Sequence, residues 1–150
     1  MNVRTVAASL VAGMLLSGAA LAHHSFSAEF DAAKPVKLTG IVTKVEWTNP
    51  HVWFYINVKD DATGQVTNWG AEMGPPHGLQ RQGWRRETLK IGESVTVDGF
   101  QARNGENRMN ARTVTLTATG GRPGQTLDAD SSAGQPNPGN GWSGRERPHR

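Results

Sequence analysis

The alternation of apolar and polar residues over residues 51–59 constrains the fold of this chain more than any other feature. A period of two places successive side chains on opposite faces of a β-strand, so that one face can pack into a core. The apolar residues of this alternation are Val52, Phe54, Ile56 and Val58. The segment therefore predicts a half-buried strand that presents His51, Trp53 and Tyr55 on its outer face.

Four other segments carry similar strand signals, with β-branched residues bounded by Gly, Pro, Asn and Asp. They are residues 36–47, 65–73, 94–102 and 108–117. Residues 77–89 instead have the spacing of one or two short helical turns, with Leu79, Trp84 and Leu89 able to face the core. A change of parity at Gly40 predicts a bulge or a bend in the first strand.

The resulting order is three strands, a short helix and two further strands. This order is typical of a mainly β protein of OB type, a small five-stranded antiparallel barrel with a short helix between strands 3 and 4. An open antiparallel sandwich is the alternative.

Residues 1–22 have the pattern of a cleavable signal peptide. A positive charge at Arg4 precedes an uncharged run from Val6 to Ala22, which is short for a membrane span. Ala20 and Ala22 are the small residues that signal peptidase requires, so we expect the mature protein to begin at His23. This predicts a periplasmic protein without a membrane anchor after processing, and an uncleaved N-terminal anchor is the alternative.

The rest of the chain divides into three parts. Residues 23–35 form a leader whose Phe26 and Phe30 could pin it to the core, and residues 36–117 form the OB-like domain. Residues 118–150 are rich in Gly and Pro and nearly devoid of aliphatic residues. Such a segment buries too little apolar surface to offset its ordering entropy, so we expect a disordered tail.

Composition and motifs narrow the function. The chain has no Cys, so an apolar core alone must hold the fold, without disulfides. The formal net charge is +3, and much of the basicity lies in the tail, which argues against nucleic acid as a partner. Neither a G-x-S-x-G motif nor a phosphate-binding loop occurs. We therefore expect a protein that is not an enzyme.

The outer face of strands 2 and 3 is the first candidate site, because OB folds usually bind ligands there. Trp53 and Tyr55 point outward from strand 2, and Glu72 points outward from strand 3. An outward Trp–Tyr pair often marks a binding surface. The sequence thus predicts a non-enzymatic binding module for a small ligand or a periplasmic protein partner. The alternative is that the leader or the tail covers these rings.

The mature N-terminus is the second candidate site. Cleavage would leave His23 with a free α-amine beside its own imidazole, and His24 adds another imidazole. Nitrogen ligands favour Cu(II) among the first-row divalent metals. His51 is the obvious third ligand and His77 a weaker fourth, which makes a periplasmic copper-binding protein the alternative function. The arrangement is similar to the N-terminal histidine ligation of copper-carrying periplasmic proteins and to the histidine brace of copper monooxygenases. These histidines could also be simply the residues that cleavage leaves behind.

Several separated motifs occur in order along the chain: H-H-S-F at residues 23–26, W-T-N-P-H-V-W at 47–53, N-W-G-A-E-M-G at 68–74 and G-W-R-R-E-T-L-K-I-G-E at 83–93. On these motifs the chain resembles a family of small secreted bacterial proteins that share a domain of unknown function. The resemblance spans about residues 23–117 and implies a periplasmic location and a small β-barrel, but no activity. The positions in these motifs that coincide with the candidate sites are His23, His24, Trp47, Asn49, His51, Trp53, Trp69 and Glu72.

Overall fold

The computed structural model describes residues 26–118 and 123–129 of the protein. The fold is mainly β, with a short helix. The elements are β1 (Phe30–Glu46), β2 (Trp53–Lys59), β3 (Val66–Glu72), α2 (Pro76–Arg81), β4 (Ser94–Ala102), β5 (Arg108–Leu116) and β6 (Gln125–Asp128). A helical turn at residues 26–29 precedes β1. None of the helices in these described ranges is long and apolar enough to cross a membrane.

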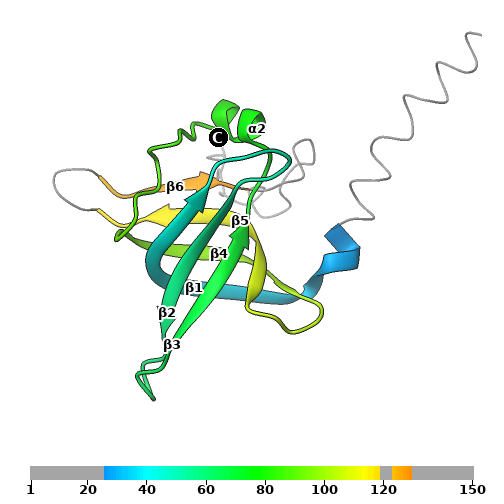
Figure 1. Ribbon diagram of the computed structural model, residues 1–150, viewed down its shortest axis with the longest axis vertical. Helices are drawn as coiled ribbons and strands as arrows, with labels where there is room; N and C mark the ends of the chain where they lie inside the picture. Colours follow the sequence, from blue (N-terminus) through cyan, green and yellow to red (C-terminus); the bar gives the residue numbers. More distant parts are fainter. Residues whose placement is uncertain (1–25, 119–122, 130–150) are drawn as a thin grey trace, which may run out of the picture.

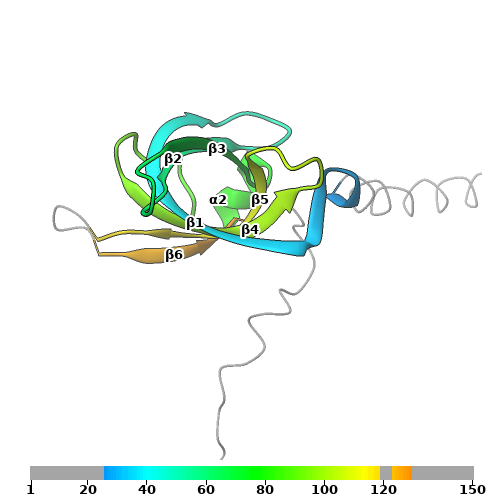
Figure 2. The same cartoon turned by 90° about the horizontal axis from the view of Figure 1, so that it is seen from below.

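The six strands form one sheet in the order β3-β2-β1-β4-β5-β6, and neighbours in this order are antiparallel. A further, parallel pairing joins Gly70 to Arg108 and Glu72 to Asn110, between β3 and β5. This pairing connects the two ends of the run β1–β5, so that five strands form a ring (Figure 2). The five predicted strands are thus confirmed, with ends shifted by a few residues for most of them.

Strand β1 belongs to two ladders and curves around the ring (Figure 1). It pairs with β4 from Phe30 to Ile41 and with β2 from Ile41 to Glu46. Gly40 lies next to the point where these ladders meet, and a Cβ there would lie 2.6 Å from the carbonyl oxygen of Asn57, so only glycine fits. Of the bulge or bend predicted at Gly40, the bulge lies elsewhere, because the register shift between β1 and β2 falls between Val42 and Lys44. The glycine permits close backbone approach instead.

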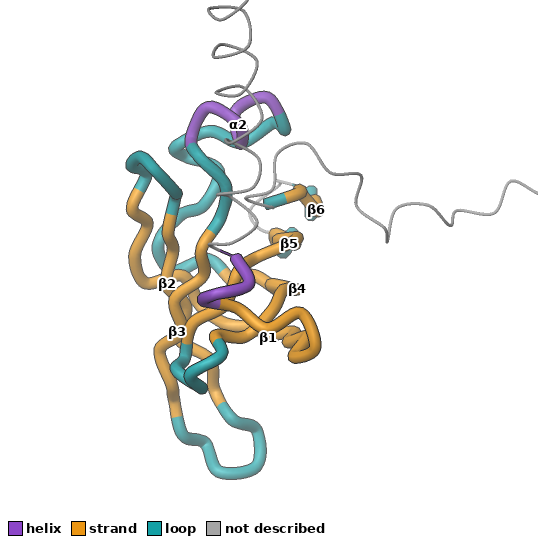
Figure 3. The backbone as a smooth tube through the Cα atoms, turned by 90° about the vertical axis from the view of Figure 1, so that its right-hand side faces the viewer, coloured by secondary structure: helices purple, strands orange, loops and turns teal. Residues whose placement is uncertain are grey.

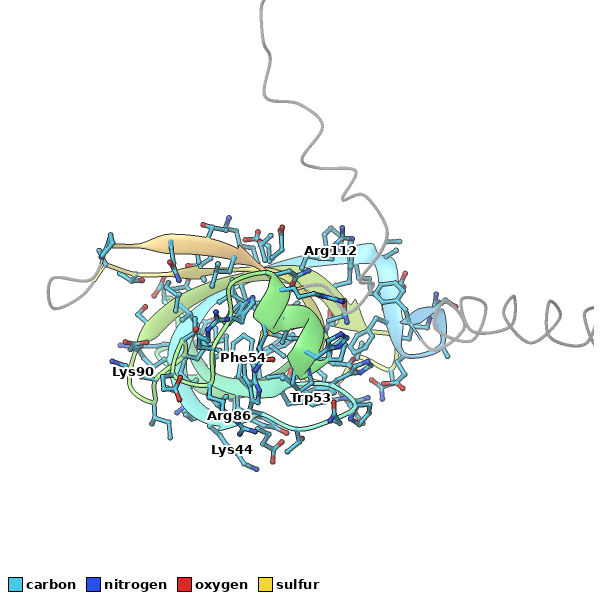
Figure 4. The ribbon with its side chains drawn as sticks, turned by 90° about the horizontal axis from the view of Figure 1, so that it is seen from above. Lys44, Trp53, Phe54, Arg86, Lys90 and Arg112 are labelled. Atoms are coloured by element: carbon cyan, nitrogen blue, oxygen red, sulfur yellow. The ribbon has the colours of Figure 1, made fainter. Side chains whose placement is uncertain are left out.

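The core fills the inside of the ring. The inward parity of β2 is confirmed, because Val52, Phe54 and Ile56 are fully buried, and Figure 4 shows Phe54 within the ring. Helix α2 lies over one end of the strands (Figure 3). Leu79 in α2 and Trp84 after it are fully buried, as their spacing predicts.

The first strand begins within the segment that the sequence predicts as a leader. Residues 23–35 were expected to precede the first strand, but β1 begins at Phe30, where it pairs with Ala102 of β4. Phe26 packs 5.9 Å from Phe30 and 6.0 Å from Phe100 between ring centroids. The phenylalanines therefore pin the described part of the leader to β4.

Strand β6 lies within residues 118–150, where the sequence predicts disorder. The prediction of disorder is therefore wrong for residues 125–128. It runs beside β5 (Figure 1) and pairs Leu127 with Val114. The indole nitrogen of Trp84 donates a hydrogen bond to the carbonyl oxygen of Asp128 at 2.6 Å, and Ala129 is fully buried. The composition of residues 118–150 does not predict this strand, because the strand forms by backbone hydrogen bonds to the edge of β5, which a polar sequence can also make. The predicted signal peptide, and residues 119–122 and 130–150 of the predicted tail, lie outside the described residues.

The docking of β6 is testable through Leu127, which packs against the core. We expect Leu127→Ala to lower the free energy of unfolding by about 1–2 kcal/mol, below the usual range for a fully buried leucine because Leu127 is only partly buried. Chemical denaturation of both proteins measures the difference. The exposed neighbour Gln125, changed to Ala, is the control and should have little effect. Equal, negligible effects of both substitutions would contradict the docking of β6.

Candidate functional site

The outer face of β2 and β3 is built from residues that alternate with the core residues. Cross-strand pairing places Trp53 opposite Glu72 and Tyr55 opposite Gly70. Trp53 and Tyr55 are half-buried, whereas Phe54 between them is fully buried. The structure thus brings the predicted aromatic pair and Glu72 onto one face.

Gly70 determines how the two rings lie on this face. A Cβ at this position would lie 3.3 Å from Cε1 of Tyr55 and 3.6 Å from Cζ3 of Trp53. Both rings therefore extend over the bare backbone of β3, and the missing side chain lets them lie close to the sheet. The result is an aromatic platform, which we define as Trp53 and Tyr55 over Gly70.

Charged groups surround the Tyr55 end of the platform. The Tyr55 hydroxyl donates a hydrogen bond to Oε2 of Glu46 at 3.1 Å, and Nζ of Lys44 lies 2.6 Å from Oε1 of Glu46. The same ammonium lies 5.3 Å from the centroid of the Tyr55 ring, within cation–π range. Figure 4 shows Lys44 at the outer edge of the ring of strands.

These contacts shift three pKa values. The hydrogen bond from Lys44, followed by that from Tyr55, lowers the pKa of Glu46, and the same carboxylate raises the pKa of Lys44. Partial burial, the hydrogen bond to Glu46 and the charge of Glu46 raise the pKa of Tyr55. The phenol therefore stays neutral at physiological pH and keeps donating to Glu46.

A second polar group lies at the Trp53 end of the platform. Nδ1 of His51 hydrogen-bonds to Oε1 of Glu72, which is only 8% exposed. Burial raises the pKa of Glu72, and the nearby charge of Glu29 acts in the same direction. The charge and hydrogen bond of His51 and a hydrogen bond from Asn110 oppose this rise.

This contact orients the imidazole of His51. An ionised carboxylate only accepts hydrogen bonds, so with Glu72 ionised the hydrogen sits on Nδ1 of His51. In the neutral imidazole, Nε2 then keeps its lone pair. The His51 side chain is 32% exposed, so the half-buried ring remains accessible to solvent. The arrangement thus leaves the lone pair of Nε2 available beside the platform, in an orientation that the contact with Glu72 sets.

Other predicted site residues lie elsewhere. Trp47 is 8% exposed and belongs to the core cluster, and Trp69 lies opposite Ile56 on the inner face. Neither joins the platform. Asn49 is exposed in the segment between β1 and β2. His23 and His24 lie outside the described residues. Within the described ranges, no group of three or more His, Cys, Asp or Glu side chains is placed to hold a metal ion.

The model of one protein family, a family of unknown function (DUF6152), matches residues 12–111. The chain belongs to this family. No curated protein matches the chain. The match to DUF6152 covers every residue of the platform together with His51 and Glu72, so the site lies within the part that the family model describes.

Sequence reasoning missed three polar contributors to this DUF6152 site: Lys44, Glu46 and Asn110. The first two alternate with Val45 near the end of β1, a period-two signal that could have placed both on the outer face. Asn110 is 1% exposed in β5 between buried neighbours, and a polar residue in such a strand indicates a buried partner. Its partner, Glu72, is distant in sequence, so only the β3–β5 pairing identifies it.

Tyr55 gives a direct test of this geometry because it is the sole tyrosine of the chain. Absorbance of tyrosinate during an alkaline titration should give a midpoint above the ordinary value of 10.0. Since the pKa is raised on folding, the neutral phenol favours the folded state, and this contribution is lost as pH rises from 10 through the folded midpoint.

We expect Glu46→Gln to lower that midpoint, because it removes the charge that opposes ionisation. Glu87→Gln is the matched control, since Glu87 is not among the groups that act on Tyr55. A midpoint at or below 10.0 in the unmodified protein, or one that Glu46→Gln leaves in place, would contradict the contact.

Proposed function

We propose that the protein is an exported, periplasmic binding module without enzymatic activity, whose ligand lies on the aromatic platform. The observation that carries this proposal is the placement of the Trp53 and Tyr55 rings over Gly70, with polar groups at both ends. The uncharged run that ends at Ala22 supports export.

The topology supports an OB-like barrel as the finer description of the ring. In that fold a helix between strands 3 and 4 covers one end, and the face of strands 2 and 3 binds ligands. Here α2 lies between β3 and β4, and the parallel β3–β5 pairing closes the ring. The aromatic platform then occupies the customary binding face of such a barrel.

The chemistry of the platform favours a ligand with a flat or ring-shaped apolar face. Two half-buried rings offer contact area at low entropy cost, and aromatic pairs contribute through offset or edge contacts. Lys44 and Glu46 at one end, and His51 at the other, can pair with polar substituents of the ligand. A protruding ring from a partner protein satisfies the same requirements.

Binding at the platform can be followed in the indole resonances of isotopically labelled protein. Trp53 is assigned from the signal that disappears in Trp53→Phe, and the probes are nucleosides, aromatic amino acids and short oligosaccharides. We expect one class of probe to shift the Trp53 signal. Tyr55→Ala should weaken the affinity of the protein for that class about tenfold, because it removes one aromatic contact worth about 1.4 kcal/mol.

The control is Ile91→Ala, which changes an exposed apolar residue that is outside the platform. It should leave the affinity unchanged. The proposal fails if two results occur together. The first is that no probe shifts the Trp53 signal of the folded protein. The second is that a pull-down from periplasmic extract finds no protein that binds the unmodified chain but not Trp53→Ala. It fails equally if Tyr55→Ala binds as tightly as the unmodified protein.

A further inference from the structure

We propose that the ligand of the aromatic platform is a neutral oligosaccharide that lies along β2. The inference rests on the proposed function of the platform and adds the chemical class of the ligand. Three features of the outer face point to this class: its length, the pairing of its charges, and the hydrogen-bonding groups at its two ends.

The platform is the middle of a longer row of outward side chains, which we call the β2 row and define as His51, Trp53, Tyr55 and Asn57. The ladder with β3 extends to Val52, whose backbone N–H donates to the carbonyl oxygen of Gly74 at 3.1 Å, so the alternation continues to His51. Residues on one face of a strand repeat about every 6.7 Å, which makes the row about 20 Å long. A ligand that touches both ends is therefore a chain, longer than one nucleoside or one aromatic amino acid.

An extended peptide does not fit the β2 row as an added strand. Such peptides pair with the exposed edge of a sheet, whose backbone groups lack partners. Strand β2 lies between β1 and β3, and its residues 53–57 fall within both ladders. The row therefore offers side chains, and not a backbone edge, to a ligand.

The cations around the platform are each paired with a carboxylate. Nζ of Lys44 lies 2.6 Å from Oε1 of Glu46, whose other oxygen accepts a hydrogen bond from Tyr55. The charge of Arg108 also acts on Tyr55, and Nε of Arg108 lies 2.9 Å from Oε2 of Glu106. A ligand on the platform thus meets ion pairs rather than single positive charges.

This pairing favours a ligand without net charge. An anionic ligand, such as a nucleotide, would compete with a carboxylate for its cation and would also meet the carboxylate of Glu72. A cationic ligand would be repelled by the ammonium of Lys44, which already lies 5.3 Å from the centroid of the Tyr55 ring. A neutral ligand disturbs neither ion pair.

The two ends of the β2 row offer hydrogen-bonding groups of opposite kinds. At one end, Nε2 of the neutral His51 imidazole is an acceptor, because Nδ1 is engaged by Glu72. At the other end, Nδ2 of Asn68 donates to Oδ1 of Asn57 at 2.9 Å. Asn57 is exposed, and no acceptor for its own NH₂ group lies in the part of the chain that the structure describes. This amide is therefore a donor available to a ligand.

A chain of sugar rings matches this surface. Hydroxyl groups both donate and accept hydrogen bonds, so they suit the acceptor at one end and the donor at the other. The C–H groups on the faces of a sugar ring can contact Trp53 and Tyr55, which lie close to the sheet over Gly70. Linked sugars repeat this combination along a chain, whereas a nucleobase or an aromatic amino acid carries its flat face only once. A neutral oligosaccharide therefore fits the length, the charge and the polar ends of the row.

The test titrates the full-length protein with neutral β-1,4-linked disaccharides and tetrasaccharides of glucose, xylose, mannose and N-acetylglucosamine, and follows the assigned Trp53 indole signal. We expect one series to bind, with the tetrasaccharide at least tenfold tighter than the disaccharide because it reaches the ends of the row. Its affinity should change less than twofold between low and high salt, since no charge of the ligand is involved. A tetramer of galacturonic acid, which is anionic, should bind at least tenfold more weakly.

Asn57→Ala tests the end of the row. It should weaken binding of the tetrasaccharide about fivefold, as loss of one hydrogen bond does, and leave binding of the disaccharide unchanged. The matched control is Gln125→Ala, which removes an exposed amide of β6, on the far side of the ring from β2 (Figure 2). Circular dichroism checks that both variants fold.

The outcomes separate this inference from the proposed function. If a nucleoside or an aromatic amino acid shifts the Trp53 signal and no oligosaccharide does, the sugar class is overturned while binding at the platform stands. If no probe shifts the signal and no partner protein is found, the binding function fails and the inference fails with it. Equal affinities for the disaccharide and the tetrasaccharide, an unchanged tetrasaccharide affinity in Asn57→Ala, or an equally tight galacturonic acid tetramer would each overturn the inference.

Discussion

The sharing of β1 between two ladders is the constraint on which the rest of this fold depends. A 17-residue strand pairs with β4 along its first part and with β2 along its last part. The two ladders meet at Ile41, next to Gly40, where the backbone of β2 approaches so closely that a Cβ would overlap the carbonyl oxygen of Asn57. Because β1 curves through this point, β3 can reach β5 and the five strands can form a ring.

Ring formation separates the two faces of every strand. One parity of β2 fills the core, so the other is displayed outside, and its neighbours are set by the pairing with β3. That pairing places Trp53 opposite Glu72 and Tyr55 opposite Gly70. This register places Gly70 under the rings of Trp53 and Tyr55. It also places Glu72 where it contacts His51. The platform and the His51–Glu72 contact are thus adjacent consequences of one ladder.

The sequence predicts the strands well, because period-two patterns are local, and the inward residues Val52, Phe54 and Ile56 are buried as their parity indicates. It predicts β6 poorly, because that strand depends on the edge of β5 rather than on its own apolar residues. Likewise, the sequence suggests Trp53 and Glu72 separately, whereas the contact of Glu72 with Asn110 requires the β3–β5 pairing. Trp47 and Trp69 were predicted as ligand contacts, but they pack in or against the core. An aromatic residue in a motif therefore does not by itself indicate a ligand contact.

The contact through which Glu72 orients His51, with Nε2 free, is the central feature of the site. Nitrogen-15 NMR of the histidine side chains at pH 8, with His51 assigned from the signals lost in a His51 variant, measures this tautomer without any ligand or metal. We expect the hydrogen on Nδ1 and the lone pair on Nε2. A His51 that carries its hydrogen on Nε2, or that populates both tautomers as free imidazole does, would contradict it.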